Sequence, residues 1–324
     1  MSFDKTVVLP LKPEAVFALI TEPERLRRWK TVAARIDLRV GGEYRWTITP
    51  GNSAMGTITE VDPGHRLVFT WGWDGQTDLP PGASTVSITL EEVPGGTSLR
   101  LVHEGLNEKQ ISGHAQGWNH YLDRLVEFST YGKVAADPWS AAPQPIDELT
   151  SAEACLAIAQ RVLLVVNSAD LRKPTRCSEF NLGELIDHQY DSLVRISGAL
   201  GIAVAKGSDS APEIRVADLG QKIVEIFRHR GLQDFLTLGT DKMPANIVAN
   251  ILNIELLVHA TDIAAAISYD LPISPVITDY VLQLAHNTIT PALRESGLFS
   301  DEITNSGTEE STGRLLAYTG RQSL

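Results

Sequence analysis

Apolar and polar residues alternate along most of the first 135 residues, in short runs separated by Gly, Pro or Asp. Alternation with a period of two is typical of strands that are buried on one face only. The pattern predicts strands at residues 5–9, 41–48, 56–61, 66–71, 84–90 and 97–103. Because these runs follow one another at regular intervals, with turn residues between them, we expect one antiparallel meander.

Helical patterns flank these strands. One helix is predicted from Pro13 to residue 20, since proline has no amide hydrogen to leave unsatisfied in the first turn, and a second short helix at 24–29. A longer helix is predicted at 113–131. The apolar face of this longer helix consists of Trp118, Tyr121, Leu122 and Leu125. The first part of the chain therefore predicts an α+β fold that ends in a long helix.

From about residue 150 onwards, apolar residues recur every three or four positions, which is the period of an amphipathic helix. Helices are predicted at residues 151–166, 182–200, 214–232, 245–267 and 277–293. Asn181 stands directly before the second of these and is a good N-cap, because its side chain can accept a hydrogen bond from a first-turn amide. Several long helices joined by loops indicate an all-α bundle.

The change of pattern divides the 324 residues into two predicted domains, 1–135 and 150–324. Residues 136–149 between them contain three prolines and several small residues, which is typical of a linker. A chain of this length suits two domains of ordinary size.

The composition and charge of the chain indicate which partners and which cell compartment to expect. The net charge of −12 leaves no basic footprint, so we expect no nucleic-acid partner. We expect no membrane partner either, because no apolar run is long enough to span a bilayer and the start of the chain lacks a signal-peptide pattern. Two cysteines are too few for a disulfide framework, and a cytoplasmic protein is predicted.

One segment of the second domain carries candidate metal ligands. Glu255 and His259 are four residues apart, so on a helix both side chains lie on one face and can reach the same ion. His188, beside the core-type residues Leu185 and Ile186 of another predicted helix, would supply a third ligand. A His–Glu–His set with an open position is a usual catalytic zinc site. The same spacing also occurs as a weak ion pair on solvated helix faces, so the spacing leaves both interpretations open.

The first domain resembles a known family. Residues 13–29 (PEAVFALITEPERLRRW), the pair Gly41-Gly42, residues 61–67 (VDPGHRL) and the pair Gly117-Trp118 resemble the START-like, or SRPBCC, domains related to heat-shock-protein ATPase activator homologues. The resemblance implies a helix-grip fold, in which a curved antiparallel sheet holds a long C-terminal helix over a hydrophobic ligand cavity.

Aromatic residues of the first domain are candidates for lining such a cavity. Strand alternation places Phe69, Trp71 and Trp73 on one face of a strand. The full set of candidates is Tyr44, Trp46, Phe69, Trp71, Trp73 and Trp118. The same residues would also serve as ordinary core, and the pattern does not separate the two roles.

The second domain resembles another family. Residues 174–188 (PTRCSEFNLGELIDH), 253–262 (NIELLVHATD) and 313–321 (GRLLAYTGR) resemble the DinB-like, mycothiol-dependent maleylpyruvate isomerase metal-binding domain. The resemblance implies an all-α, DinB-like four-helix bundle that holds a divalent metal, with zinc favoured, on His188, Glu255 and His259. It also implies mycothiol as a thiol co-substrate. Thr261 departs from the pattern, because the family usually has an aromatic residue there.

Two neighbours of the candidate ligands allow alternative roles. Asp262 lies three residues beyond His259, where it could accept a hydrogen bond from the imidazole as a second-shell residue or remain a solvated helix residue. Cys177 is expected to be a small buried residue of the turn before the helix, not a ligand.

The leading hypothesis is a metal-binding, two-domain protein whose N-terminal domain binds a small apolar or amphipathic ligand. The second resemblance implies a mycothiol- or other thiol-dependent transferase or isomerase, with no general base identifiable from the sequence. One alternative is a non-enzymatic small-molecule-binding or stress-associated protein with a structural or vestigial metal site. Another, a partner-binding protein, rests on analogy with the chaperone activators alone.

Overall fold

The computed structural model describes residues 2–177, 179–204, 210–295, 299–303 and 310–321. The chain forms two compact units, Met1–Asp137 and Pro138–Leu324. The division lies inside the segment 136–149 that the proline pattern predicts as a linker. Each unit has its own cluster of buried hydrophobic residues.

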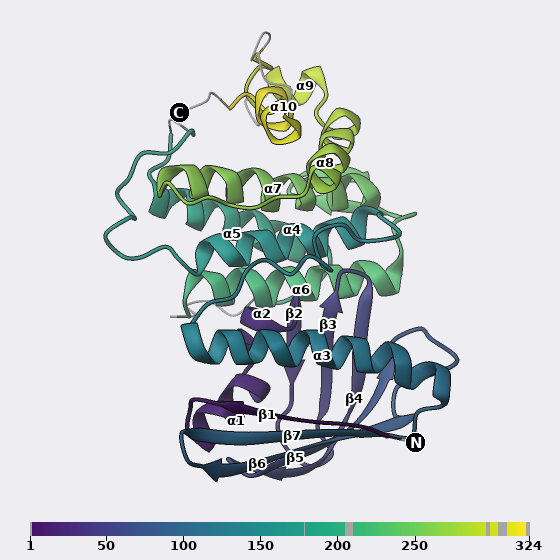
Figure 1. The fold of residues 1–324 in the computed structure, drawn as a ribbon. Coiled ribbons are helices and arrows are strands. Elements are labelled where there is room, and N and C mark those ends of the chain that lie inside the picture. Colours follow the sequence, from purple (N-terminus) through teal and green to yellow (C-terminus); the bar gives the residue numbers. More distant parts are fainter. Residues whose placement is uncertain (1, 178, 205–209, 296–298, 304–309, 322–324) are drawn as a thin grey trace. The chain divides into compact units, whose positions relative to one another are not determined.

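The N-terminal unit contains a seven-stranded antiparallel sheet (Figure 1). Its strands are β1 (Ser2–Leu9), β2 (Ala33–Ile36), β3 (Glu43–Thr49), β4 (Asn52–Asp62), β5 (Arg66–Trp73), β6 (Ser84–Val93) and β7 (Gly96–Glu104), in the spatial order β1-β7-β6-β5-β4-β3-β2. Strands β2 to β7 therefore form the predicted meander, and β1 pairs with β7, as in the register Phe3↔His103. Strand β2 escaped prediction because its four residues show no clear alternation.

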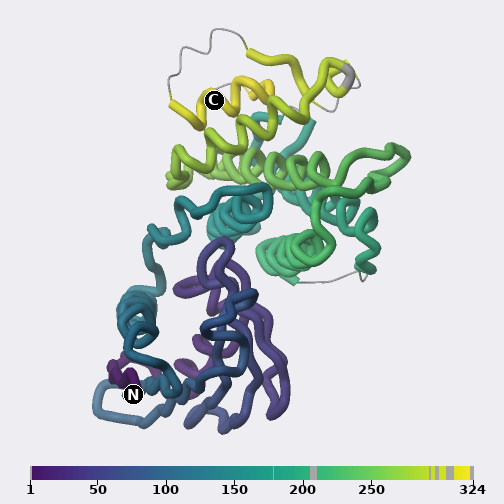
Figure 2. The backbone as a smooth tube through the Cα atoms, turned by 90° about the vertical axis from the view of Figure 1, so that its right-hand side faces the viewer, coloured from purple at the N-terminus to yellow at the C-terminus, as the bar shows by residue number. Residues whose placement is uncertain are grey.

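The helices of this unit are α1 (Pro13–Thr21), α2 (Pro23–Trp29) and α3 (Glu108–Tyr131). Helix α3 begins five residues before the predicted start, at a capping box in which Asn107 Oδ1 accepts from Gln110 N (2.9 Å) and Gln110 Oε1 accepts from Asn107 N (3.0 Å). Its buried face contains the predicted residues Trp118, Tyr121, Leu122 and Leu125. Figure 2 looks nearly along α3 and shows the sheet curving on one side of it. This is the predicted helix-grip arrangement.

The loop between β5 and β6 folds back over the end of β5. Trp73 N donates to Leu79 O (2.8 Å). A Cβ at Gly72 would lie 1.9 Å from the Pro80 carbonyl oxygen, so only glycine allows this close approach. Gln110 Nε2 donates to Asp78 O (2.8 Å), which ties the loop to the first turn of α3.

The C-terminal unit is mainly helical (Figure 1). Its elements are α4 (Glu148–Leu163), α5 (Leu182–Ala199), α6 (Pro212–Arg230), β8 (Phe235–Leu238), β9 (Asp241–Pro244), α7 (Ala245–Ala266), α8 (Pro275–Thr288), α9 (Pro291–Glu295) and α10 (Ser311–Tyr318). Helices α4 and α5 both pack against α6 and α7, and α8 packs against α7 and α10. The relationship to DinB-like bundles stays a prediction.

Helix α7 is the core helix of this unit. Within the described residues it is the one helix whose length and composition would suit a membrane span. However, 83% of its most apolar 18-residue window is buried among the other residues of the protein, as in the core helix of a folded bundle.

Two elements of this unit differ from the sequence pattern. The single helix predicted at 277–293 is interrupted after Thr288, because Pro291 disfavours helical backbone at the residue before it and starts the short helix α9. The β8–β9 hairpin was not predicted, since each strand has only four residues.

Candidate functional site

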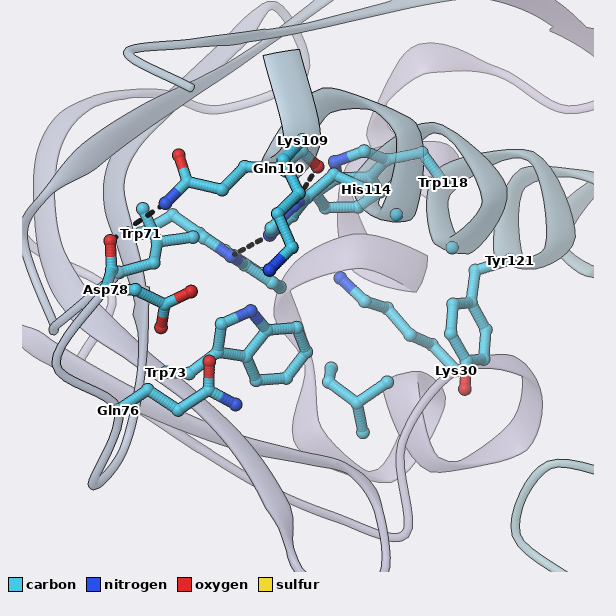
Figure 3. Close-up of a pocket in the computed structure, with 14 residues that line it drawn as sticks. Lys30, Trp71, Trp73, Gln76, Asp78, Lys109, Gln110, His114, Trp118 and Tyr121 are labelled. Carbon is cyan, nitrogen blue, oxygen red and sulfur yellow. Dashed lines mark hydrogen bonds between the residues drawn. The ribbon is translucent and has the colours of Figure 1, made fainter. Parts of the chain in front are cut away.

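A cavity of about 320 Å³ opens in the N-terminal unit beside α3, the end of β5 and the loop after it (Figure 3). Its wall is mostly apolar and aromatic, whereas Gln76, Asp78 and Lys109 are exposed and line it as polar groups. The other lining residues are Lys30, Ile48, Trp71, Trp73, Leu79, Gln110, Gly113, His114, Gly117, Trp118 and Tyr121. Small-molecule pockets measure about 300–1,000 Å³, so this one suits a small ligand.

His114 holds Trp71 in the cavity wall. Trp71 Nε1 donates to His114 Nε2 (3.3 Å), and His114 Nδ1 donates to the Gln110 carbonyl oxygen (2.8 Å). These partners require a neutral imidazole with its proton on Nδ1, and burial accordingly lowers the pKa of His114. The Trp71 N–H is therefore already occupied by a protein partner.

His103 holds Trp118 in a similar way. Trp118 Nε1 donates to His103 Nδ1 (3.0 Å), and His103 Nε2 donates to Ser84 Oγ (2.9 Å), which in turn donates to the Trp71 carbonyl oxygen (3.1 Å). Burial, together with the nearby His114 and Lys30, lowers the pKa of His103 to about 3. The two indole rings thus belong to one hydrogen-bonded wall built from β5, β6, β7 and α3.

Lys30 is the buried cationic side chain of the cavity. Its Nζ lies 4.3 Å from the ring centre of Trp46, 4.5 Å from that of Trp118 and 5.4 Å from that of Trp71. No hydrogen-bond acceptor or carboxylate pairs with Nζ within the part of the chain that the structure describes. Burial lowers the pKa of Lys30 to about 7.

The backbone at Lys30 is fixed from two sides. Lys30 N donates to Leu26 O (2.9 Å) and closes the last turn of α2. The preceding carbonyl oxygen, that of Trp29, accepts from Arg124 Nε of α3 (2.9 Å). These bonds direct the lysine toward the interior of the helix grip.

The structure distributes the six candidate aromatic residues over three environments. Trp71, Trp73 and Trp118 line the cavity. Trp46 lines a separate void of about 20 Å³, while Tyr44 and Phe69 line neither space. Tyr44 and Phe69 are fully packed core, because their rings meet at 5.2 Å and the Tyr44 hydroxyl donates to Thr70 O (2.9 Å).

Sequence reasoning missed Lys30, His114 and Tyr121 as cavity residues. Lys30 follows Arg27, Arg28 and Trp29 in a charged segment, and its burial arises only when α2 packs against α3. A helical projection of α3 could have identified His114 and Tyr121, because they stand one turn before and one turn after Trp118.

In the C-terminal unit, the structure brings His188 of α5 together with Glu255 and His259 of α7. Glu255 Oε2 lies 3.5 Å from His259 Nε2 and 3.9 Å from His188 Nε2. One nitrogen or oxygen from each of the three residues lies within 4.8 Å of the others. The structure therefore brings the three donor groups within reach of one ion. The four-residue spacing predicts the pair on α7, whereas the approach of His188 depends on the packing of α5 against α7.

Local structure positions His188. Asn181 caps α5, because its Oδ1 accepts from Glu184 N (3.0 Å) while Glu184 Oε2 accepts from Asn181 N (2.9 Å). The Phe180 ring stacks on the His188 imidazole with 4.9 Å between ring centres. The imidazole thereby keeps a third of its surface exposed while it faces α7.

Asp262 lies behind His259 and is fully buried, so it is not a solvated helix residue. Its Oδ2 is 3.5 Å from His259 Nδ1, and Arg321 Nε lies 3.4 Å from the same oxygen. The Cys177 thiol donates to this oxygen at 3.6 Å. Cys177 is half-buried, not fully buried as predicted, and it belongs to a second group of possible ligands with His259 and Asp262.

The carboxylates of Glu255 and Asp262 and the imidazole of His259 stabilise one another's charged forms. Burial disfavours ionised Glu255, but the interaction with the positively charged His259 outweighs this effect and holds the Glu255 pKa at about 2. Burial likewise disfavours charged His259, but Asp262, Cys177 and Glu255 raise its pKa well above the ordinary value. Burial lowers the pKa of His188.

The remaining histidines of this unit take no part in the cluster. His229 is exposed on α6, and His286 packs against the Tyr318 ring at 4.2 Å. Asp187, beside His188 in sequence, is exposed and lies 3.5 Å from Arg215.

Comparisons with known proteins concern part of the chain. Residues 10–129 match the family model described as activator of Hsp90 ATPase homolog 1-like protein. No curated protein matches the chain.

Solved structures of similar proteins also cover only part of the chain. An AHSA1-like protein from Rhizobium etli is 40% identical over 45% of this chain and 92% of its own, with a TM-score of 0.38. CalU16 from Micromonospora echinospora is 30% identical over 40% of this chain and 77% of its own, with a TM-score of 0.34. DynU16, a protein of the dynemicin biosynthetic locus, is 21% identical over 41% of this chain, with a TM-score of 0.36, and the chain spans 48% of DynU16.

Proposed function

The N-terminal unit of this chain belongs to the AHSA1-like family, and we propose that it binds a small apolar or amphipathic molecule in the cavity beside α3. The cavity itself is the observation that supports this proposal. Its walls include Trp71, Trp73 and Trp118, which offer large apolar surfaces, and its polar groups stand at exposed positions. Apolar surface that a ligand buries in this cavity would favour binding by about 25 cal/mol of transfer free energy per Å².

Gly117 of α3 gives a sharp test of the proposal. A Cβ at Gly117 would have no heavy atom within 4 Å, so a leucine there would extend into the cavity without straining the helix. Gln116, the preceding residue, is exposed and provides a matched control on the same helix. The probe is Prodan, a small neutral naphthalene dye whose emission shifts to the blue in apolar surroundings.

Full-length protein should bind Prodan with a saturable blue shift. Gly117→Leu should weaken binding at least about tenfold, because the leucine occupies the ligand's space, whereas Gln116→Leu should leave binding unchanged. Absence of saturable binding, or equal binding by the two variants, would contradict the proposal.

A second function is supported by a different observation, the convergence of His188, Glu255 and His259. We propose that these residues bind one divalent metal ion, with zinc as the first candidate. Glu255 Oε2 is buried and makes no hydrogen bond of good geometry in the described part of the chain, although the His259 imidazole lies 3.5 Å away. A divalent cation between the carboxylate and the two imidazoles would satisfy this buried oxygen.

The surrounding residues fit this role. Asp262 can accept a hydrogen bond from His259 Nδ1, which leaves His259 Nε2 facing Glu255 and fixes the orientation of the ring. Arg321 and the Cys177 thiol hold the Asp262 carboxylate in place. A bound divalent ion would supply Lewis acidity and lower the pKa of a water or thiol at a remaining coordination position.

The resemblance to the maleylpyruvate isomerase family makes mycothiol the candidate thiol, and a thiol-dependent transfer or isomerisation in the cytoplasm is the activity we propose for a metal-loaded protein. A metal site with a purely structural or vestigial role in a non-enzymatic ligand-binding protein is the alternative. Thiol-dependent turnover by the zinc-loaded protein, lost in His259→Ala, would separate the two.

Zinc binding is measured directly by calorimetric titration of the full-length protein after chelator treatment. We expect one tight site. His188→Ala and His259→Ala should each weaken it more than about 100-fold, since loss of an outer-shell partner alone costs 10–100-fold. His229→Ala, which removes an exposed histidine of the same unit, should change nothing. Equal affinities for all three variants would exclude this site.

A further inference from the structure

The N-terminal cavity contains a feature that a purely apolar ligand would not use. Lys30 lines the cavity (Figure 3). Its Nζ lies among the rings of Trp46, Trp71 and Trp118. The side chain is 6% exposed, so its charged form has lost most of its hydration. Buried lysines are usually paired with a carboxylate.

The protein supplies no such partner to Lys30. Within the described residues, no ion pair or hydrogen bond reaches its Nζ, and the lining carboxylate, Asp78, is exposed. The indole N–H groups of Trp71 and Trp118 are bound to His114 and His103. These two indole N–H groups are therefore satisfied, whereas among the described residues the Lys30 amine and the buried Trp46 Nε1 have no hydrogen-bond partner.

Aromatic faces stabilise a cation but do not neutralise it. Three indole rings within 4.3–5.4 Å of Nζ offer cation–π attraction, yet burial still lowers the pKa of Lys30 to about 7. The ligand-free site therefore holds one positive charge that has no counter-ion. A ligand anion would fill that place with a charge-assisted hydrogen bond in a water-poor setting.

We propose that the natural ligand of this cavity carries one carboxylate, which pairs with Lys30, on an aromatic or otherwise apolar body that packs against Trp71 and Trp118. This proposal rests on the proposed ligand-binding function of the N-terminal unit and specifies its ligand class. A single charge is expected because Lys30 is the one buried cation among the lining residues described, since Lys109 is exposed and both histidines are held neutral by their partners. The carboxylate end enters first, and the apolar body extends toward the exposed Gln76 and Lys109.

The experiment compares two probes of equal shape, naphthalene-2-carboxylate and naphthalene-2-carboxamide, as competitors of Prodan on the full-length protein at pH 6.5. The carboxylate should displace Prodan at a concentration at least about tenfold lower than the carboxamide. Lys30→Met should remove this preference while the carboxamide still binds. Lys109→Met, which removes the exposed lysine of the same cavity, should keep the preference.

The outcomes distinguish this proposal from the proposed function. If neither naphthalene binds and Prodan does not bind, the ligand-binding function itself fails. If both naphthalenes bind equally well, or if Lys109→Met and not Lys30→Met removes the preference, the cavity binds ligands but Lys30 is not the carboxylate partner.

A second measurement does not depend on the folding of a variant. On the unaltered protein, the advantage of the carboxylate over the carboxamide should shrink as pH rises from 7 to 9, because the Lys30 amine loses its proton. Other titratable or charged groups face this amine or the cavity: His103, His114, Tyr121, Asp78 and Lys109. His103 and His114 have lowered pKa values and Tyr121 a raised one, so all three stay neutral over this range. An advantage of the carboxylate that stays constant from pH 7 to 9 on the unaltered protein would overturn the proposal.

Discussion

Lys30 Nζ lies 4.5 Å from the centre of the Trp118 ring, and it has no carboxylate beside it in the part of the chain that the structure describes. Lys30 is the residue that caps the C-terminal end of α2, and Trp118 lies on α3, which packs against α2. A buried amine kept at an aromatic wall, at a cost in stability, is more useful to a ligand site than to a core.

The first prediction concerns that cost. The Lys30 pKa of about 7 lies below its ordinary value of 10.5, so between these pH values the unfolded chain binds more protons than the folded one. The unfolding free energy therefore rises with pH across this window, and the penalty is present at pH 7 and below. Lys30→Met should raise the unfolding free energy by up to about 4 kcal/mol at pH 7, at about 1.4 kcal/mol per pH unit.

Urea unfolding followed by tryptophan fluorescence measures this effect, because all tryptophans except Trp139 lie in the N-terminal unit. The stabilisation should shrink as pH rises and vanish above pH 10.5, where the lysine is neutral in both states. Lys109→Met should leave stability unchanged at every pH. A Lys30→Met variant less stable than the parent at pH 7 would mean that the amine contributes to the core.

The second prediction concerns acid sensitivity of the same unit. The His103 pKa of about 3 lies below its ordinary value of 6.5, so the folded unit resists protonation at this site. The stability that neutral His103 contributes is fully present above pH 6.5 and is lost as pH falls toward 3. At pH 5 the loss is about 2 kcal/mol. His114 acts in the same direction, since its pKa is also lowered.

His103→Gln should make the tryptophan-monitored unfolding free energy fall less steeply between pH 6.5 and 5. His65 is exposed in the turn between β4 and β5 and offers a control. The idea would be abandoned if His65→Gln flattened the pH profile as much as His103→Gln.

The third prediction concerns Asp262. Its Oδ2 lies 3.5 Å from His259 Nδ1, on the side of the ring opposite to Glu255. Asp262→Asn should weaken zinc binding about 10–100-fold, which is less than removal of His259 itself. Calorimetric zinc titration with circular dichroism of the helices checks this order, and an Asp262→Asn affinity equal to that of the parent would exclude an orienting role.

The fourth prediction concerns the independence of the two units. Each has its own buried hydrophobic cluster, so the fragments 1–137 and 138–324 should each fold cooperatively when expressed alone. Thermal unfolding by circular dichroism would show a transition for each. Two unfolded fragments from a chain that folds when whole would show that the units depend on each other.

Much of the fold follows from local patterns. The alternating strands from β3 to β7 and the apolar stripe of α3 are long enough for their period to be recognised, whereas β2 and the β8–β9 hairpin are too short. Pro291 ends a helix that the apolar pattern alone would continue. The ends of the helices depend on capping residues. Asn107, for example, caps α3 and starts the helix before its apolar stripe begins.

The candidate sites were less evenly predictable. The spacing of Glu255 and His259 marks one face of α7, and His188 was singled out on α5, yet their convergence depends on how two helices pack. Nothing in the sequence indicates that Lys30 is a cavity residue, because a lysine in a segment with two arginines is typical of a protein surface. Tyr44 and Phe69, which share the aromatic pattern of Trp71, became core because they lie farther from the loop that follows β5.

The most direct test of a ligand in this cavity is the indole N–H region of the proton–nitrogen NMR spectrum of the full-length protein, with each tryptophan assigned by substitution. On titration with naphthalene-2-carboxamide, the signals of Trp71, Trp73 and Trp118 should shift together and saturate at one ligand per chain, while that of Trp139 stays in place. Unchanged cavity signals, or equal shifts of Trp139 and the three cavity tryptophans, would contradict ligand binding at this site.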